Sequence, residues 1–94
     1  MSRAFVKEDA GHEPEPRYDL PDPESPHFPE ASAWALIQGA DAGDSRSAEL
    51  ATGYSWGDKR LVAHIENILA RAEERGEDRV AQLARRYLRR AAEG

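Results

Sequence analysis

The residues that could perform acid–base or metal chemistry are few and poorly spaced for it. The histidines are His12, His27 and His64, and no two of them have the four-residue spacing that places two metal ligands on one face of a helix. His64 falls beside the apolar stripe of a predicted helix, where a boundary residue is more typical than a base or a ligand. We therefore expect neither a metal site nor a cofactor.

The motifs of nucleophilic catalysis and phosphate binding are also missing. The chain contains no cysteine, and no serine is flanked by the glycines of a nucleophile elbow. The stretch GADAGDS, residues 39 to 45, lacks the lysine that a phosphate-binding loop needs after its glycines. Acidic residues are numerous but scattered through the amino-terminal segment, where nothing would hold two carboxylates at a working distance. The sequence therefore predicts a protein that is not an enzyme.

Cysteine usage and the first residues bear on the compartment. Without cysteine the chain can build neither a disulfide framework nor the usual zinc sites, which favours an intracellular protein. In the opening stretch MSRAFVKEDAG the apolar run is Ala4, Phe5 and Val6, too short for a signal peptide. No stretch approaches the length of a membrane span. We expect a cytoplasmic protein that does not enter membranes.

The amino-terminal segment, residues 1 to 28, is predicted to be an extended acidic arm. All six prolines lie in residues 14 to 29, where they fix φ and remove amide donors, so a helix is excluded there. Such an arm is either a solvated spacer or a strap that docks on the chain's own helices or on another protein. Its large apolar side chains favour the strap. The expected anchors are Phe5, Tyr18, Leu20 and Phe28, the last packing over Trp34 or Ile37 of the first helix.

The beginning of the arm carries a resemblance to a known family. The stretch SRAFVKEDAG, followed by Pro- and acid-rich residues and then SPH, resembles the leader of bacterial proteins related to the Gre transcript-cleavage elongation factors. Those factors bind RNA polymerase. After Pro29 the sequence shows neither their long coiled coil nor their globular domain, so transcript cleavage is not implied. The resemblance implies a shared leader and RNA polymerase as the docking partner, with Phe5 as the expected contact.

Residues 29 to 94 are predicted to form a small helical domain. No proline follows Pro29, and apolar residues recur at helical spacing in an alanine-rich sequence. Turns rich in glycine and acidic residues divide this part into three or four short antiparallel helices, so the predicted fold class is all-α. The expected limits are Pro29 to Gly43, the Asp44 cap to Gly53, the Asp58 cap to Gly76, and a last helix from the Asp78 cap onward.

The third and fourth helices carry the clearest apolar stripes. The stripe of the third helix is about 120° wide, and His64, Asn67, Arg71 and Glu74 lie away from it. The connection between these two helices, around Gly76, is so short that they must form an antiparallel hairpin. The stripes consist of Leu61, Val62, Ile65, Ile68, Leu69 and Ala72, and of Val80, Leu83, Ala84, Tyr87, Leu88 and Ala91.

A second resemblance concerns the helical part. The segment WALIQGADAGDSRSAELATGYSWGD resembles the Sel1 variety of tetratricopeptide repeat in its Ala-x-x-Gly-Asp turn and its later Gly-Tyr. Gly43 and Gly76, which both stand in turns between Ala-rich helices, are separated by nearly the repeat length of about 34 residues. The resemblance implies helix hairpins, which is the architecture already expected.

Charge is distributed unevenly along the chain. Residues 1 to 58 have four Lys and Arg against twelve Asp and Glu, a net charge of −8, whereas residues 59 to 94 have nine against six, a net charge of +3. The cations of the last helix project from one face. This face has three possible interpretations: a nucleic-acid-binding patch, a solvated face whose cations interact favourably with the helix dipole, or a surface neutralised by the acidic half of the chain. This face consists of Arg79, Arg85, Arg86, Arg89 and Arg90.

Together these features favour a non-enzymatic protein–protein interaction module associated with the transcription machinery. The alternative is a nucleic-acid-associated protein that uses its Arg-rich last helix. A core built from about sixty residues is small, so packing against a partner or a second copy in a homodimer would add stability. The expected partner contacts are Phe5, Tyr18 and Phe28 in the arm and Arg85, Arg86, Arg89 and Arg90 in the last helix.

Overall fold

The computed structural model describes Tyr18 and residues 20–94, and this part of the chain is all-α, as predicted. Its helices join through short turns, and no strand occurs within it. The expected third helix is divided, because it begins with a single 3-10 turn, η2. The elements are α1 (Phe28–Asp41), α2 (Ser45–Thr52), η2 (Lys59–Leu61), α3 (Val62–Arg75) and α4 (Asp78–Glu93).

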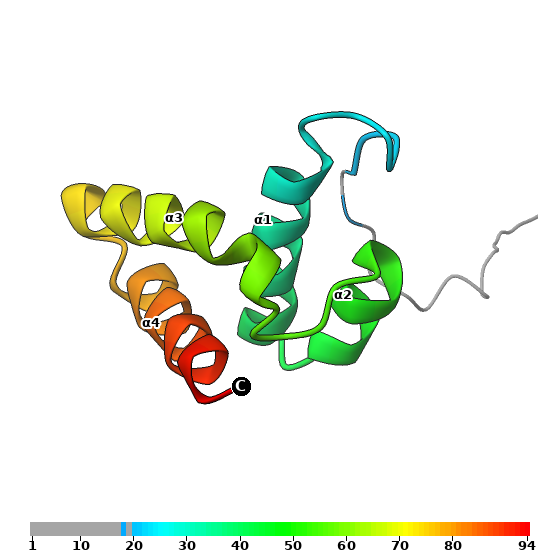
Figure 1. Ribbon diagram of the computed structural model, residues 1–94. Helices are drawn as coiled ribbons and strands as arrows, with labels where there is room; N and C mark the ends of the chain where they lie inside the picture. The colour runs from blue at the N-terminus through cyan, green and yellow to red at the C-terminus, as the bar shows by residue number, and fades with distance from the viewer. Residues whose placement is uncertain (1–17, 19) are drawn as a thin grey trace, which may run out of the picture.

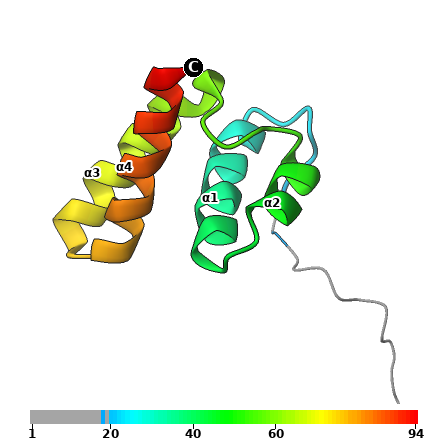
Figure 2. The same ribbon diagram turned by 90° about the horizontal axis from the view of Figure 1, so that it is seen from below.

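The helices form two hairpins that meet at α1. Helices α1 and α2 lie side by side as one pair, and α3 and α4 lie side by side as the other (Figures 1 and 2). Helix α1 also contacts α3 and α4, whereas α2 packs mainly on α1. Helix α1 is therefore the central element, and the segment from Gly53 to Asp58 connects the two pairs.

The helix boundaries follow local signals, with two corrections to the predicted caps. The Asp44 carboxylate accepts from the Ser47 amide at 3.3 Å and caps α2, as predicted. Asp58 caps η2 and not α3, since its carboxylate accepts from the Arg60 amide at 2.8 Å. Asp78 is the first residue of α4, and Glu77 occupies the N-cap position, so the predicted Asp78 cap is wrong. Asp78 still stabilises α4, because an acidic residue in the first turn interacts favourably with the helix dipole.

One core is shared by all the helices. The apolar stripes predicted for α3 and α4 face each other and pack against α1, and Leu36, Ile65 and Tyr87 are fully buried. Burial of such side chains contributes about 1.5–3 kcal/mol each. Trp34 is only partly buried at the edge of this core. The central residues are Ala33, Leu36, Ile37, Ala48, Leu61, Ile65, Ile68, Leu83, Ala84, Tyr87 and Ala91.

Helices α1 and α2 approach each other closely at Gly39. A Cβ atom at this position would lie 2.7 Å from the Cβ of Ala48 and 3.1 Å from the Asp44 carbonyl oxygen. Such distances are shorter than van der Waals contact, so the backbones can pack this tightly only because residue 39 is glycine. Gly39 therefore sets the spacing of the first hairpin.

Candidate functional site

The candidate site is a pocket between α1 and α3. Its volume is about 730 Å³, which is within the range of small-molecule and peptide side-chain sites. Trp34 of α1 and Ile68 of α3 supply its apolar surface, and charged and polar side chains surround them. The lining residues are Glu30, Trp34, His64, Asn67, Ile68, Ala70, Arg71, Glu73 and Glu74.

Helical periodicity explains why these side chains meet. On α3, residues 64, 67, 68, 71 and 74 recur at intervals of three and four, so they share one face of the helix. On α1, Glu30 and Trp34 are four residues apart and point to the same side. The sequence analysis correctly placed His64, Asn67, Arg71 and Glu74 away from the apolar stripe. It did not predict that they lie next to α1. The available signal in the sequence was the four-residue spacing of Glu30 and Trp34, which places both side chains on one face of the first helix.

The pocket carries more negative than positive charge. Three carboxylates line it, those of Glu30, Glu73 and Glu74, against one guanidinium, that of Arg71. Glu73 is engaged elsewhere, because its carboxylate accepts a 2.7 Å hydrogen bond from Arg85 of α4. Glu30 and Glu74 form no ion pair with any residue in the described part of the chain. Both side chains are exposed at the surface of the pocket.

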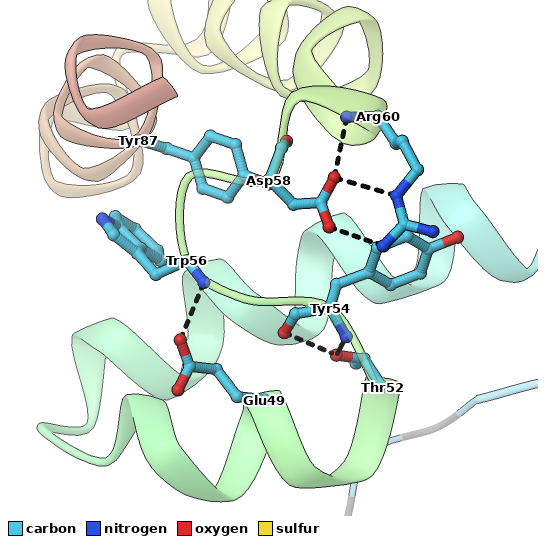
Figure 3. Close-up of polar contacts among 7 residues, drawn as sticks. All are labelled: Glu49, Thr52, Tyr54, Trp56, Asp58, Arg60 and Tyr87. Atoms are coloured by element: carbon cyan, nitrogen blue, oxygen red, sulfur yellow. Dashed lines mark hydrogen bonds and ion pairs between the residues drawn. The ribbon is translucent and has the colours of Figure 1, made fainter. Parts of the chain in front are cut away.

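A second group of interacting side chains lies in the connector between the hairpins (Figure 3). The backbone amide of Trp56 donates to the Glu49 carboxylate at 2.7 Å, and the Trp56 ring packs edge-on against Tyr87 with 5.0 Å between the ring centroids. Tyr54 places its ring 6.2 Å from that of Phe28 and beneath the Arg60 guanidinium. The connector thus contacts the start of α1, helix α2 and helix α4.

Asp58 is the centre of the polar contacts at the end of the connector. The Tyr87 hydroxyl donates to the Asp58 carbonyl oxygen at 2.7 Å, and Arg60 donates twice to the Asp58 carboxylate, at 3.1 and 2.7 Å. The Arg60 hydrogen bond lowers the pKa of Asp58. Burial raises the pKa of Tyr87 far above its usual range. Because these hydrogen bonds join Asp58 to Arg60 and to α4, we interpret this cluster as a structural contact between the connector and the helices.

The arginines of α4 are largely paired with carboxylates. Arg79 donates to Asp41 of α1 at 2.9 Å, and Arg85 donates to Glu73 of α3. The Arg90 guanidinium lies 3.7 Å from the Glu93 carboxylate, and its side chain covers Gly57 of the connector. Of the cations that the sequence analysis placed on one face, Arg86 and Arg89 are exposed and have no ion pair within residues 20–94.

Two of the expected aromatic anchors of the arm, Phe28 and Tyr18, pack against the chain's own helical part. Phe28 is the first residue of α1 and is 9% exposed, and its ring partner is Tyr54, which the sequence analysis had not considered. Tyr18 is half-buried against the core, where burial and then the charge of Asp44 raise its pKa. Phe5, the expected external contact, lies outside the described residues.

Comparisons with known proteins identify no relative of this chain. We found no match to this chain among protein-family models, curated proteins or solved structures. Among the helices of the described residues, none combines the length and the apolar character needed to cross a bilayer. Within the same part of the chain, no three acidic or histidine side chains gather into a group that could hold a metal ion.

Proposed function

We propose that this chain is a non-enzymatic protein–protein interaction module. The pocket between α1 and α3 is the observation that supports this proposal best. It combines an indole and an isoleucine side chain with exposed carboxylates, which suits a partner's side chain, and its lining contains no serine, threonine, cysteine or lysine. The remaining conspicuous polar cluster, around Asp58, is occupied by contacts within the chain.

The partner proposed for the leader, the beginning of the arm of residues 1 to 28, is RNA polymerase. Support comes from the resemblance of SRAFVKEDAG and SPH to the leader of Gre-related proteins. Since Phe28 and Tyr18 are engaged by the chain's own helices, Phe5 is the anchor left to contact the polymerase.

Binding of the full-length chain to purified bacterial RNA polymerase tests this proposal. We expect a saturable complex by biolayer interferometry and weaker binding by Phe5→Ala. The matched control is Leu50→Ala, because Leu50 is a 71% exposed apolar residue of α2 outside both the leader and the pocket. If no complex forms, polymerase is not the partner, and if Phe5→Ala binds as the parent does, Phe5 is not the contact.

The alternative function, association with nucleic acid, is supported by exposed Arg86 and Arg89. It is weakened by the ion pairs of Arg79, Arg85 and Arg90 with carboxylates. Titration of a mixed-sequence oligonucleotide at several salt concentrations separates the two functions. A dissociation constant weaker than about 100 μM at physiological salt, in the range of non-specific binding or beyond it, would remove this alternative.

A further inference from the structure

We propose that the pocket between α1 and α3 binds an arginine side chain presented by a short segment of a partner protein. The proposal rests on the interaction function proposed above and adds the chemistry of the partner. It follows from three observations on the pocket: a partly exposed indole, two carboxylates without an ion pair among the described residues, and access from solvent.

The indole of Trp34 supplies an aromatic surface for a cation. Trp34 lines the pocket and is only partly buried, whereas its neighbours Ala33 and Ala35 are buried in the core. Tryptophan is the best aromatic partner for a cation placed over its ring, and arginine is the more frequent cation in such pairs. A guanidinium can stack on the indole while its edge remains available for hydrogen bonds.

The carboxylates of Glu30 and Glu74 supply acceptors from two helices of the pocket, one from α1 and one from α3. A guanidinium presents its donors in a planar fork that matches a carboxylate, which a lysine ammonium does not. Asn67 adds a neutral polar side chain to the lining. Arg71 is the one cation of the lining, and the carboxylates outnumber it.

The size and exposure of the pocket fit a segment of chain. A volume of about 730 Å³ is larger than one side chain needs, and Glu30, Asn67, Ala70 and Glu74 are exposed at its surface. The partly buried Trp34 and the exposed Ala70 of the lining offer apolar contact to a residue next to the arginine. The expected ligand is therefore an arginine with an apolar neighbour.

The test is a nuclear magnetic resonance titration of the full-length chain with an acetylated, amidated hexapeptide of alternating arginine and leucine. We expect saturable shifts of the Trp34 indole resonance, assigned with Trp34→Phe, and of the backbone amides of residues 64 to 74. The control ligand is the same peptide with citrulline in place of arginine. Citrulline keeps the shape but removes the charge, so it should bind at least about fivefold more weakly.

Variants of the carboxylates make the test specific for this site. Glu30→Gln and Glu74→Gln are surface changes that preserve the fold, and each should weaken peptide binding about two- to fivefold, the range for exposed ion pairs. Glu66→Gln is the matched control, since Glu66 is an exposed residue of α3 outside the pocket. It should bind the peptide as the parent does.

Other results would overturn the proposal. These are equal binding of the citrulline peptide, equal losses in Glu66→Gln and Glu74→Gln, or shifts that spread over other surfaces. Shifts of the same resonances with protein concentration alone would identify a second copy of the chain as the occupant. If the peptide fails to bind while RNA polymerase binds through the leader, this inference falls and the proposed function remains.

Discussion

At the scale of single residues, the hydroxyl of Tyr87 joins α4 to the connector. It is fully buried and donates to the Asp58 carbonyl oxygen at 2.7 Å. Tyr87→Phe leaves that carbonyl without its donor, so we expect the free energy of unfolding at pH 7 to fall by about 1–2 kcal/mol. Urea denaturation measures this loss. A variant as stable as the parent would show that the bond contributes nothing net.

The same hydroxyl gives the chain a dependence on alkaline pH. Burial raises the pKa of Tyr87 in the folded state above the ordinary tyrosine value of 10.0, so folding favours the neutral phenol. The stability that this group contributes is therefore complete below pH 10 and is lost as the pH rises above that value. Urea denaturation between pH 8 and 11 should show a smaller alkaline loss in Tyr87→Phe than in the parent.

Ser32 is an isolated polar group in the core. Its hydroxyl is buried in α1 and has no hydrogen-bond partner among the residues that the structure describes. Ser32→Ala should raise the free energy of unfolding by about 0.5–1.5 kcal/mol, because it removes a desolvated hydroxyl and improves helix propensity. The control is Ser47→Ala, which removes the 2.8 Å bond from the Ser47 hydroxyl to Asp44 and should not stabilise the chain.

At the scale of elements, the contact of α1 with α2 depends on Gly39. In an open helix Gly→Ala is stabilising by about 0.5–1 kcal/mol. Here the added methyl group would overlap Ala48, so Gly39→Ala should lower the free energy of unfolding by about 1–3 kcal/mol. Thermal denaturation of the double variant Gly39→Ala, Ala48→Gly should recover part of that loss. No recovery would mean that the contact with Ala48 is not the cause.

The hairpin of α3 and α4 depends on the phase of its apolar stripes. Ile65 is 0% exposed in α3, so Ile65→Asp places an unpaired charge in the core and should remove most of the helical circular dichroism signal. The cost is about 3–5 kcal/mol, a large share of the stability of a small domain. Ala63→Asp, at an exposed position of the same helix, is the control and should melt like the parent.

At the scale of the whole molecule, the two hairpins share one core. The core cluster takes residues from every helix, and the connector packs Tyr54 on Phe28 and Trp56 on Tyr87. We therefore expect near-ultraviolet circular dichroism of the aromatic residues and far-ultraviolet dichroism of the helices to follow a single urea transition. Two separate transitions would show that the hairpins unfold independently.

The amino-acid sequence by itself determined the helical segments and their apolar faces. Proline, glycine and acidic caps act on the residues next to them, which is why the Asp44 cap and the helix end at Gly76 were predictable. The stripes of α3 and α4 were predictable for the same reason, because a stripe depends only on spacing within one helix. The caps predicted at Asp58 and Asp78 were misplaced, because an added 3-10 turn after Asp58 and a shift of one residue at Asp78 change little in the local pattern.

Only the tertiary structure decided which faces meet. Trp34 and His64 are brought to one pocket, Arg79 to Asp41, and Tyr54 to Phe28, although each pair is far apart in the chain. Spacing shows which side of a helix is apolar, but it does not show which neighbour covers the rest. That choice depends on the close approach of α1 and α2 at Gly39 and on the path of the connector, which arise only when all the helices pack together.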